Sequence, residues 1–343
     1  MNMAAGYDTT TLLGVKELLP KFTPLFLQMF FPTSATFDTE EVAFDKIKKD
    51  RRLAPFVSPL VSGRPRRERG GFLTTMKPAY IKETDVVRPT RLLKRRLGEA
   101  LNGEMSVAQR HEAVVADILV EQEENIVARE EWMAVQAVLY GKVIMQGDDH
   151  PPVEVDYGRS PENQIVLAGA AKWDTVDPET YDPTDDLEEW SSETTGAVGL
   201  VIMGKGAWKL FSRFKAVREL LETRRGSTSQ LELGPQLEKE VMRKGFFGEF
   251  EIIVYTGKFT NDQGQKENFM PEYGVLIAPA TADNVMAYGA IQDAEANANG
   301  LAAAERYPSN WFTKNPSVEW LQTQAAPVPV LFDADEFTFV LVA

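Results

Sequence analysis

The stretch "SVAQRHEAVVADILVEQEENIVAREEWMAVQAVLYG", residues 106–141, decides the fold because it predicts one long helix. Ser106 is a suitable N-cap, and Gly141 is a natural stop. At 1.5 Å per residue the helix is roughly 50 Å long, so it is a spine for something larger than a compact globule. Its apolar residues recur at helical spacing and form one stripe: Val115, Leu119, Ile126, Met133 and Ala137. Five glutamates lie off this stripe and are expected on a solvated face: Glu121, Glu123, Glu124, Glu130 and Glu131.

Strand patterns follow the helix and dominate the C-terminal half of the chain. "KVIMQG" and "VEVDYG", within residues 142–158, alternate like the two strands of a hairpin. Residues 207–224 have an amphipathic helical pattern, whereas 250–259 and 273–279 predict buried strands. The end of the chain, 328–343, predicts two strands around a turn. The fold class is therefore α+β, with a strand-rich C-terminal half.

Charge is distributed unevenly along the 343 residues, whose formal net charge is −14. Residues 46–96 hold sixteen Lys/Arg and four Asp/Glu, so they are basic while the rest of the chain is strongly acidic. Within them, 56–92 predicts a long, open β-hairpin with too few apolar residues to fold alone. Such a segment can grip nucleic acid or the acidic face of another copy. The second interpretation is favoured, since an acidic body repels a polyanion.

The inter-subunit interpretation names contact residues on both sides. The predicted loop contacts are Arg64, Arg66, Arg67, Arg69, Phe72, Tyr80 and Lys82. The candidate acidic partner surface consists of Asp182, Asp185, Asp186, Glu121 and Glu124. Phe72 and Tyr80 are too few aromatics for a single-strand nucleic-acid platform.

Residues 1–45 predict an arm. "LLPKFTPLFLQMFFP" places four aromatic residues among prolines that limit any helix to a short one. These aromatics need a surface to bury on, either the protein's own body or a neighbouring copy. They are Phe22, Phe26, Phe30 and Phe31.

Two motifs suggest chemistry, and both fit structural explanations better. Gly199–Gly206, "GLVIMGKG", has phosphate-loop spacing with Lys205 in place, but Gly206 stands where Ser or Thr must hold magnesium. Its four intervening residues are apolar and predict a core strand ending in a turn. The acidic run 174–190 lacks the Gly and Glu positions of a calcium loop and predicts a turn leading into a helix near Thr184.

The remaining composition also argues against an enzyme. The chain has no Cys and two His, His111 on the long helix and His150 in a predicted turn, and neither has a His partner for zinc. No catalytic, cofactor or metal residue is predicted. No segment has the length of a membrane helix, and the N-terminus lacks a secretion pattern, so a cytoplasmic protein without a membrane partner is expected.

The arrangement of these pieces resembles a tailed-phage major capsid protein of the HK97-like fold. The motifs "PLFLQMFF", "FVSPLVSG", "VEVDYGRS", "YDPTDD", "FKAVRELLETRRGS", "YGAIQDA", "RYPSNW" and "DADEF" are similar to the phage lambda major head protein family, also called the protein E family. They run from about residue 24 to about residue 338, and their shared order is specific.

The resemblance implies a division of the chain into the parts of a capsid subunit. These are an N-terminal arm at 1–50, an extended loop at 56–96, a peripheral domain at 97–164 and 326–343 with its spine helix at 106–140, and a β-rich axial domain at 165–325.

The resemblance also implies partners and a location. Copies are expected to form the hexamers and pentamers of an icosahedral head around double-stranded DNA, assembled in the host cytoplasm and found in the virion. The family-like arm begins almost at Met1, so a separate scaffolding protein is expected, together with a portal and non-specific contact with packaged DNA. No motif marks a Lys–Asn cross-link, so a decoration protein at three-fold positions is expected to reinforce the shell.

Three alternatives stay open at this point. An encapsulin-like cargo shell shares the fold and would enclose a cargo protein instead of DNA. A nucleotide-binding enzyme would act through Lys205. A non-assembling DNA-binding protein would use the basic segment.

Overall fold

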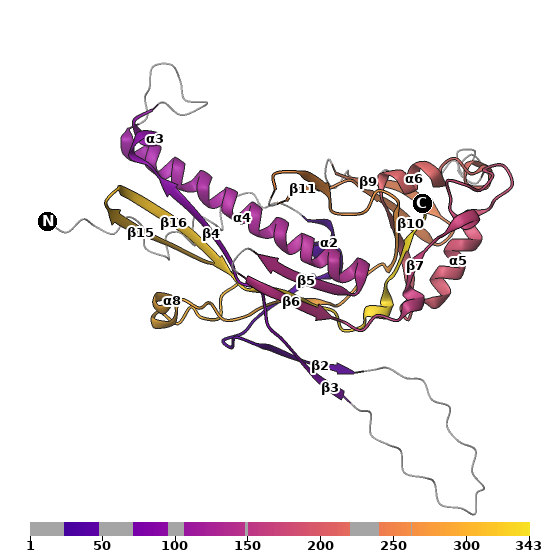
Figure 1. Ribbon diagram of the computed structural model, residues 1–343, viewed down its shortest axis with the longest axis horizontal. Coiled ribbons are helices and arrows are strands. Elements are labelled where there is room, and N and C mark those ends of the chain that lie inside the picture. Colours follow the sequence, from indigo (N-terminus) through magenta and orange to yellow (C-terminus); the bar gives the residue numbers. More distant parts are fainter. Residues whose placement is uncertain (1–23, 48–70, 95–105, 148–149, 220–239, 262) are drawn as a thin grey trace, which may run out of the picture.

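Helix α4 (Val107–Tyr140) is the axis of the computed structural model, which describes residues 24–47, 71–94, 106–147, 150–219, 240–261 and 263–343. Figure 1 shows α4 running obliquely along the molecule, with a long β-hairpin beside its N-terminal half and a larger sheet beyond its C-terminal end. The predicted spine helix is confirmed, and so is the α+β class.

Both ends of α4 are satisfied by specific contacts. Ser106 and Gln109 form a reciprocal capping box, and Gly141 adopts the left-handed conformation at φ 63° that suits a glycine. The guanidinium of Arg159 donates to the carbonyls of Val138 and Leu139, at 2.7 Å each. These bonds fill carbonyl positions that the last turn of a helix leaves unpaired.

The burial of α4 changes along its length. The predicted apolar stripe is buried, and Glu121 and Glu124 are exposed as expected. The prediction is wrong for Glu130 and Glu131, which are 2% and 0% exposed. The reason is that the C-terminal half of α4 is enclosed on nearly all sides by segments from both ends of the chain.

The largest sheet has six strands and is covered on both faces. In strand β8, Leu200 and Ile202 belong to the core shared with α4, while Val201 and Met203 face the core under α5 and α6. This explains why the strand is a continuous apolar run instead of an alternating one. The strand order is β7 (Gln164–Val166), β18 (Thr338–Leu341), β13 (Gly274–Pro279), β8 (Val198–Met203), β10 (Phe250–Tyr255), β9 (Val241–Phe247). The covering helices are α5 (Pro183–Glu193) and α6 (Lys205–Phe211).

A three-stranded sheet lies against the N-terminal half of α4. Leu321 and Val87 pack there on Val114, Val115 and Ile118. The strand order is β15 (Tyr307–Lys314), β16 (Ser317–Ala325), β4 (Ile81–Val87). Helix α3 (Pro89–Leu93) follows β4 directly, and its Leu92 packs on the same cluster.

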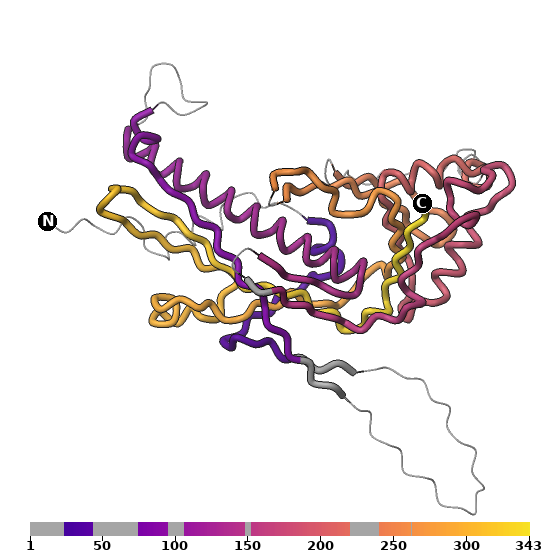
Figure 2. Tube along the Cα trace, in the orientation of Figure 1, coloured from indigo at the N-terminus to yellow at the C-terminus, as the bar shows by residue number. Residues whose placement is uncertain are grey.

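The smaller elements connect these parts. Figure 2 shows the indigo N-terminal residues beside the C-terminal half of α4, next to orange and yellow strands from the other end of the chain. One sheet is β1 (Thr33–Thr36), β14 (Val285–Tyr288), β17 (Pro327–Val330), and the two-stranded ladders are β2 (Val42–Ile47) with β3 (Gly71–Met76), β5 (Lys142–Gly147) with β6 (His150–Asp156), and β11 (Lys258–Thr260) with β12 (Lys266–Asn268). The short helices are α2 (Leu25–Phe30), α8 (Ala294–Ala298), η1 (Pro161–Asn163), η2 (Gly169–Ala171) and η3 (Ala334–Glu336).

Several predicted elements need correction. The 142–158 hairpin is confirmed as β5–β6, although His150 opens a strand and does not lie in a turn. The hairpin expected at 56–92 differs: β3 pairs with β2, which begins before residue 56, and β4 pairs with β16. Residues 56–63 lie outside the described part of the chain. The helix expected at 207–224 is divided, since α6 ends at Phe211.

The sheets also cross the domain limits expected from the resemblance. Strand β18 was assigned to the peripheral part, yet it lies within the six-stranded sheet. Strands β15 and β16 were assigned to the axial part, yet they pair with β4 beside the spine helix. The pairing partners are far apart in sequence, so the local patterns could not reveal them.

Candidate assembly interface

The predicted loop contacts are only partly covered by the structure. Arg64, Arg66, Arg67 and Arg69 lie outside the described residues, as does Phe22. Phe72 lies in β3, opposite Lys46 in the ladder. Lys82 is exposed on β4, with its ammonium 5.2 Å from the centre of the Tyr80 ring.

Tyr80 uses its hydroxyl within the subunit, and its contact with a neighbouring copy stays a prediction. It donates to Oε1 of Gln324 at 2.7 Å and accepts from the backbone N–H of Gln292 at 3.0 Å. These bonds hold the start of β4 against the segment that follows β14. The side chain therefore has a structural role in its own subunit.

The candidate acidic residues form two separate surfaces and not one. Glu121 and Glu124 lie exposed on α4, and Asp185 lies exposed on α5 near the opposite end of the molecule (Figure 1). Asp182 caps α5 by accepting from the N–H of Thr184 at 2.9 Å.

Asp186 also makes its hydrogen bonds within the subunit. Its carboxylate accepts from Nε1 of Trp173 at 2.7 Å and from the hydroxyl of Tyr181 at 2.7 Å. It therefore anchors the loop before α5, and its oxygens are already used. The exposed acidic face available on the spine helix includes Glu121 and Glu124, within reach of Asp117 one turn earlier.

Helix α3, the start of α4 and the β15–β16 hairpin lie at one end of the molecule (Figure 1), and each carries at least one large exposed apolar side chain. Leu93 is 73%, Val107 52%, Phe312 44% and Trp311 39% exposed. Trp311 stacks on Trp320 of the paired strand, with ring centres 6.1 Å apart. Aromatic residues are enriched at protein interfaces, and large exposed apolar groups mark contact surfaces. Trp311 and Phe312 are consecutive in a strand, so they face opposite sides of the hairpin. The sequence does not mark these residues as exposed, because adjacent aromatic residues in a strand usually indicate the core.

The arm aromatics pack within the subunit. Phe26 and Phe30 are fully buried and Phe31 is 5% exposed, all in the core that also holds the C-terminal half of α4. Phe26 lies 5.7 Å from Tyr255 and Phe30 lies 5.2 Å from Phe337, measured between ring centres. Of the two surfaces that the sequence left open, the protein's own body is correct for these three residues.

A single carboxylate holds this N-terminal helix in place. Glu131 accepts from the backbone N–H groups of Phe26 and Leu27 at 3.0 Å each, and from the hydroxyl of Tyr255 at 3.0 Å. It thereby caps the first turn of α2, whose own N-cap, Pro24, supplies no side-chain bond. Burial raises the pKa of Glu131 to about 7. The three donors oppose this rise, because they stabilise the charged carboxylate.

Replacing Glu131 by Gln should remove a pH dependence of stability. The folded-state pKa lies above the unfolded one, so the stabilisation is present below pH 4.5 and is lost as the pH rises through about 7. The free energy of unfolding of the native protein, relative to E131Q, should therefore fall by on the order of 3 kcal/mol between pH 4.5 and pH 8. Urea unfolding of unassembled protein measures this, with the exposed Glu124→Gln as control. Parallel pH profiles for native protein and E131Q would contradict the assignment.

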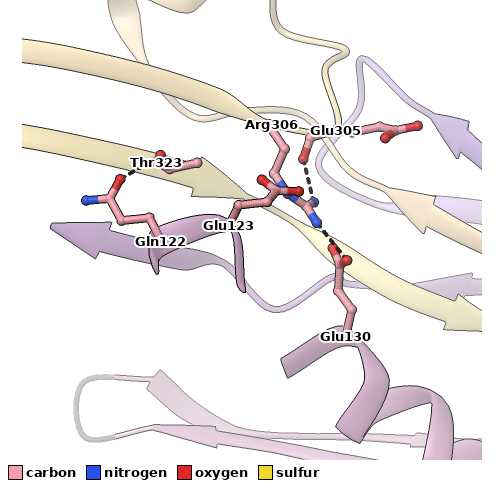
Figure 3. Close-up of polar contacts among 6 residues, drawn as sticks. All are labelled: Gln122, Glu123, Glu130, Glu305, Arg306 and Thr323. Atoms are coloured by element: carbon pink, nitrogen blue, oxygen red, sulfur yellow. Dashed lines mark hydrogen bonds and ion pairs between the residues drawn. The ribbon is translucent and has the colours of Figure 1, made fainter. Parts of the chain in front are cut away.

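A buried ionic cluster fixes the β15–β16 hairpin to the spine helix (Figure 3). Nη2 of Arg306 lies 2.6 Å from Oε2 of Glu130, and its Nε lies 3.4 Å from Oε2 of Glu123. Nη1 donates to the carbonyl of Glu305 at 3.0 Å, and the guanidinium lies over the ring of Tyr288. Burial raises the pKa of Glu130, and the charge of Arg306 opposes that rise.

Hydrogen bonds next to the cluster also connect α4 to β16. The hydroxyl of Thr323 donates to Oε1 of Gln122 at 2.7 Å, and Nε2 of Gln122 donates to the carbonyl of Leu321 at 3.1 Å. Near the start of α4, His111 lies 2.5 Å from Glu319. These contacts hold the β15–β16 hairpin, which carries Trp311 and Phe312, firmly against the spine helix.

The phosphate-loop match is explained by packing. A Cβ at Gly204 would lie 2.2 Å from the carbonyl oxygen of Pro271, and one at Gly206 would lie 2.7 Å from Glu272. The N–H of Ala207 donates to the carbonyl of Glu272 at 3.0 Å. The chain itself thus fills the place where a phosphate would sit, and the glycines are needed for close approach.

Neither a cluster of metal ligands nor a membrane-spanning helix occurs among the described residues. No group of three or more potential metal ligands occurs among those residues. None of their helices combines the length and the apolar character needed to span a bilayer.

Comparisons with known proteins agree with one another. A family model described as phage major capsid protein E matches residues 8–342. The chain is 40% identical to the major capsid protein of Escherichia phage lambda over 339 residues, 98% of this chain and 99% of that protein, and equally identical to that of Escherichia phage N15 over the same shares. The crystal structure of a prophage capsid protein from E. coli CFT073 superposes with a TM-score of 0.80 at 30% identity, covering 99% of this chain and all of the other.

Proposed function

The chain belongs to the phage major capsid protein E family, and from that premise we propose that its copies form the hexamers and pentamers of an icosahedral head enclosing double-stranded DNA. Membership of this family already establishes the general role of the protein. The protein is a structural subunit that self-assembles into a phage capsid, it is located in the virion, and it is not an enzyme.

The observation that carries the proposal is the exposed apolar end of the molecule. Leu93, Val107, Trp311 and Phe312 present large side chains from three different elements, on a base held by the Arg306 cluster. A monomer gains nothing from such a surface, whereas a neighbouring copy would bury it. Rigid mounting favours repeated contacts of one geometry, which a closed shell requires.

The basic loop supplies the second contact in this proposal. The loop of one copy, 56–96, lies on the acidic outer face of the spine helix of the next, where Glu121 and Glu124 are exposed. Each exposed ion pair stabilises by only about 0–1 kcal/mol. Many such pairs in one shell add up, while their individual weakness lets misplaced copies leave.

Strand pairing suggests how the subunit is divided. The peripheral part would consist of α4 with β4, β15 and β16 and the β5–β6 hairpin. The axial part would consist of the six-stranded sheet with α5 and α6. The arm, at 1–50, would include α2, which is docked in the core of its own subunit.

Further partners belong to the same proposal. They are a separate scaffolding protein, a portal, a decoration protein at three-fold positions and packaged DNA held without sequence preference. Assembly would take place in the host cytoplasm. The absence of Cys excludes disulfide bonds between copies of this chain, and the proposal relies on non-covalent contacts.

Negative-stain electron microscopy tests the proposal. The protein is expressed alone and together with the neighbouring phage genes, and closed shells tens of nanometres across are expected in the second preparation. Shells that hold another protein and never DNA would favour a cargo container instead. Monomers in both preparations would overturn the assembly function.

A further inference from the structure

A shallow groove of about 550 Å³ lies along strand β4 and helix α3. Thr84 and Val86 line it from the strand, and Arg88, Arg91 and Lys94 line it from the residues that follow. We call it the β4–α3 groove. Its residues belong to the second half of the loop, 56–96, but Arg88, Arg91 and Lys94 are not among the loop residues assigned above to contacts between copies.

The groove is positively charged. Arg88, Arg91 and Lys94 are exposed, and within the described residues no carboxylate pairs with them. The groove has one carboxylate, that of Asp85, and Oδ2 of Asp85 accepts from Nε2 of Gln122 at 3.0 Å. Three unpaired cations in one depression favour an anionic occupant.

The groove also offers backbone hydrogen-bonding groups. In the part of the chain that the structure describes, β4 pairs with β16 on one side and with nothing on the other. Its seven residues, Ile81–Val87, contain no proline or bulge. A strand edge of this kind accepts an extended polypeptide as an additional strand.

We propose that the β4–α3 groove binds an extended acidic segment of a partner protein, which adds as a strand to the free edge of β4. Its carboxylates would pair with Arg88, Arg91 and Lys94. The backbone supplies affinity, and the three cations select for acidic side chains on the incoming strand. This role is separate from shell formation by copies of the chain.

Two other occupants fit the observations less well. A nucleic acid would use the cations but not the free backbone edge of β4. A second copy offers an acidic strand in β6, which carries exposed Glu154 and Asp156 on alternate residues. Pro152 precedes them and cannot donate to a ladder, so β6 is a poor added strand.

The test uses the unassembled full-length protein and a fluorescent peptide of alternating threonine and glutamate, with binding followed by fluorescence anisotropy. The double variant Arg91→Glu with Lys94→Glu should weaken binding by about tenfold or more. Methylating alternate backbone amides of the peptide should weaken it similarly, because the added strand loses its donors. The matched charge change Lys258→Glu with Lys266→Glu, on the exposed β11–β12 ladder, should leave binding unchanged.

Each contrary outcome overturns the proposal in a distinct way. If the methylated peptide binds as tightly as the unmethylated one, the groove attracts the peptide by charge alone and no strand is added to β4. Binding of duplex DNA without binding of the peptide would make the occupant a nucleic acid. Tighter binding of a peptide copied from residues 152–157 would make it a second copy. No binding of any probe would reject the groove, and shells seen by microscopy would still stand.

Discussion

A subunit carrying Arg66→Glu, Arg67→Glu and Arg69→Glu should fold normally and form no shells. The native loop would be attracted to the acidic face of a neighbouring spine helix. Reversing three charges converts each of these weak attractions into a repulsion of similar size, about 0–1 kcal/mol per pair. The effect on a shell is far larger, since every copy carries the same three repulsions.

Two further variants make this experiment specific. Reversing Lys209, Lys258 and Lys266, which are exposed elsewhere, changes the net charge equally and should leave shells intact. Adding Glu121→Arg and Glu124→Arg to the loop variant should restore some assembly, because attraction returns with opposite signs. Circular dichroism and microscopy measure folding and shells. Normal shells from the triple loop variant would refute the loop contact.

Replacing Arg306 by Met should lower the free energy of unfolding by about 3–5 kcal/mol. The substitution leaves Glu130 and Glu123 without their cation. Glu130 is only 2% exposed, so water cannot replace that cation. A buried carboxylate without a partner is costly, and the hairpin that carries Trp311 would lose its anchor to the spine helix. The loss of stability should therefore be accompanied by a loss of assembly.

The cost should follow the unpaired charge and not the lost side chain. Adding Glu130→Gln and Glu123→Gln to Arg306→Met should recover part of the stability, because neutral amides tolerate burial better. Arg243→Met removes a partly exposed pair with Glu251 and should cost less than about 1 kcal/mol. Urea unfolding measures all three variants. An Arg306→Met protein within 1 kcal/mol of native would show that the cluster does not stabilise the fold.

The sequence revealed those features that depend on neighbouring residues. Helix α4, its N-cap Ser106, its stop at Gly141 and the β5–β6 hairpin all follow from periodicity and local chemistry. The short helix among the N-terminal prolines is likewise a local consequence. The failed phosphate-loop motif was recognised from one missing hydroxyl, and the packing at Gly204 gives the physical reason.

The sequence could not reveal contacts between residues that lie far apart in the chain. Glu130 and Glu131 look solvated beside their helical neighbours, yet they meet Arg306 and the backbone of Phe26. Nothing local marks Tyr80 as bonded within its subunit either, since its partner Gln324 lies 244 positions away. The exposed aromatic end also needed the structure, because a strand with Trp311 and Phe312 usually predicts core.

The capping of α2 by Glu131 has a consequence for the order of folding. The bonds join residues 105 positions apart, and strand β1 must wait for β14, since Thr33 pairs with Val285. The first part of the chain to leave the ribosome is thus among the last to find its native partners. A nascent chain still attached to the ribosome has no finished N-terminal segment and no completed large sheet, because β18 lies within the last six residues of the chain. Subunits are therefore expected to become competent for assembly only after release, which keeps half-made chains out of growing shells.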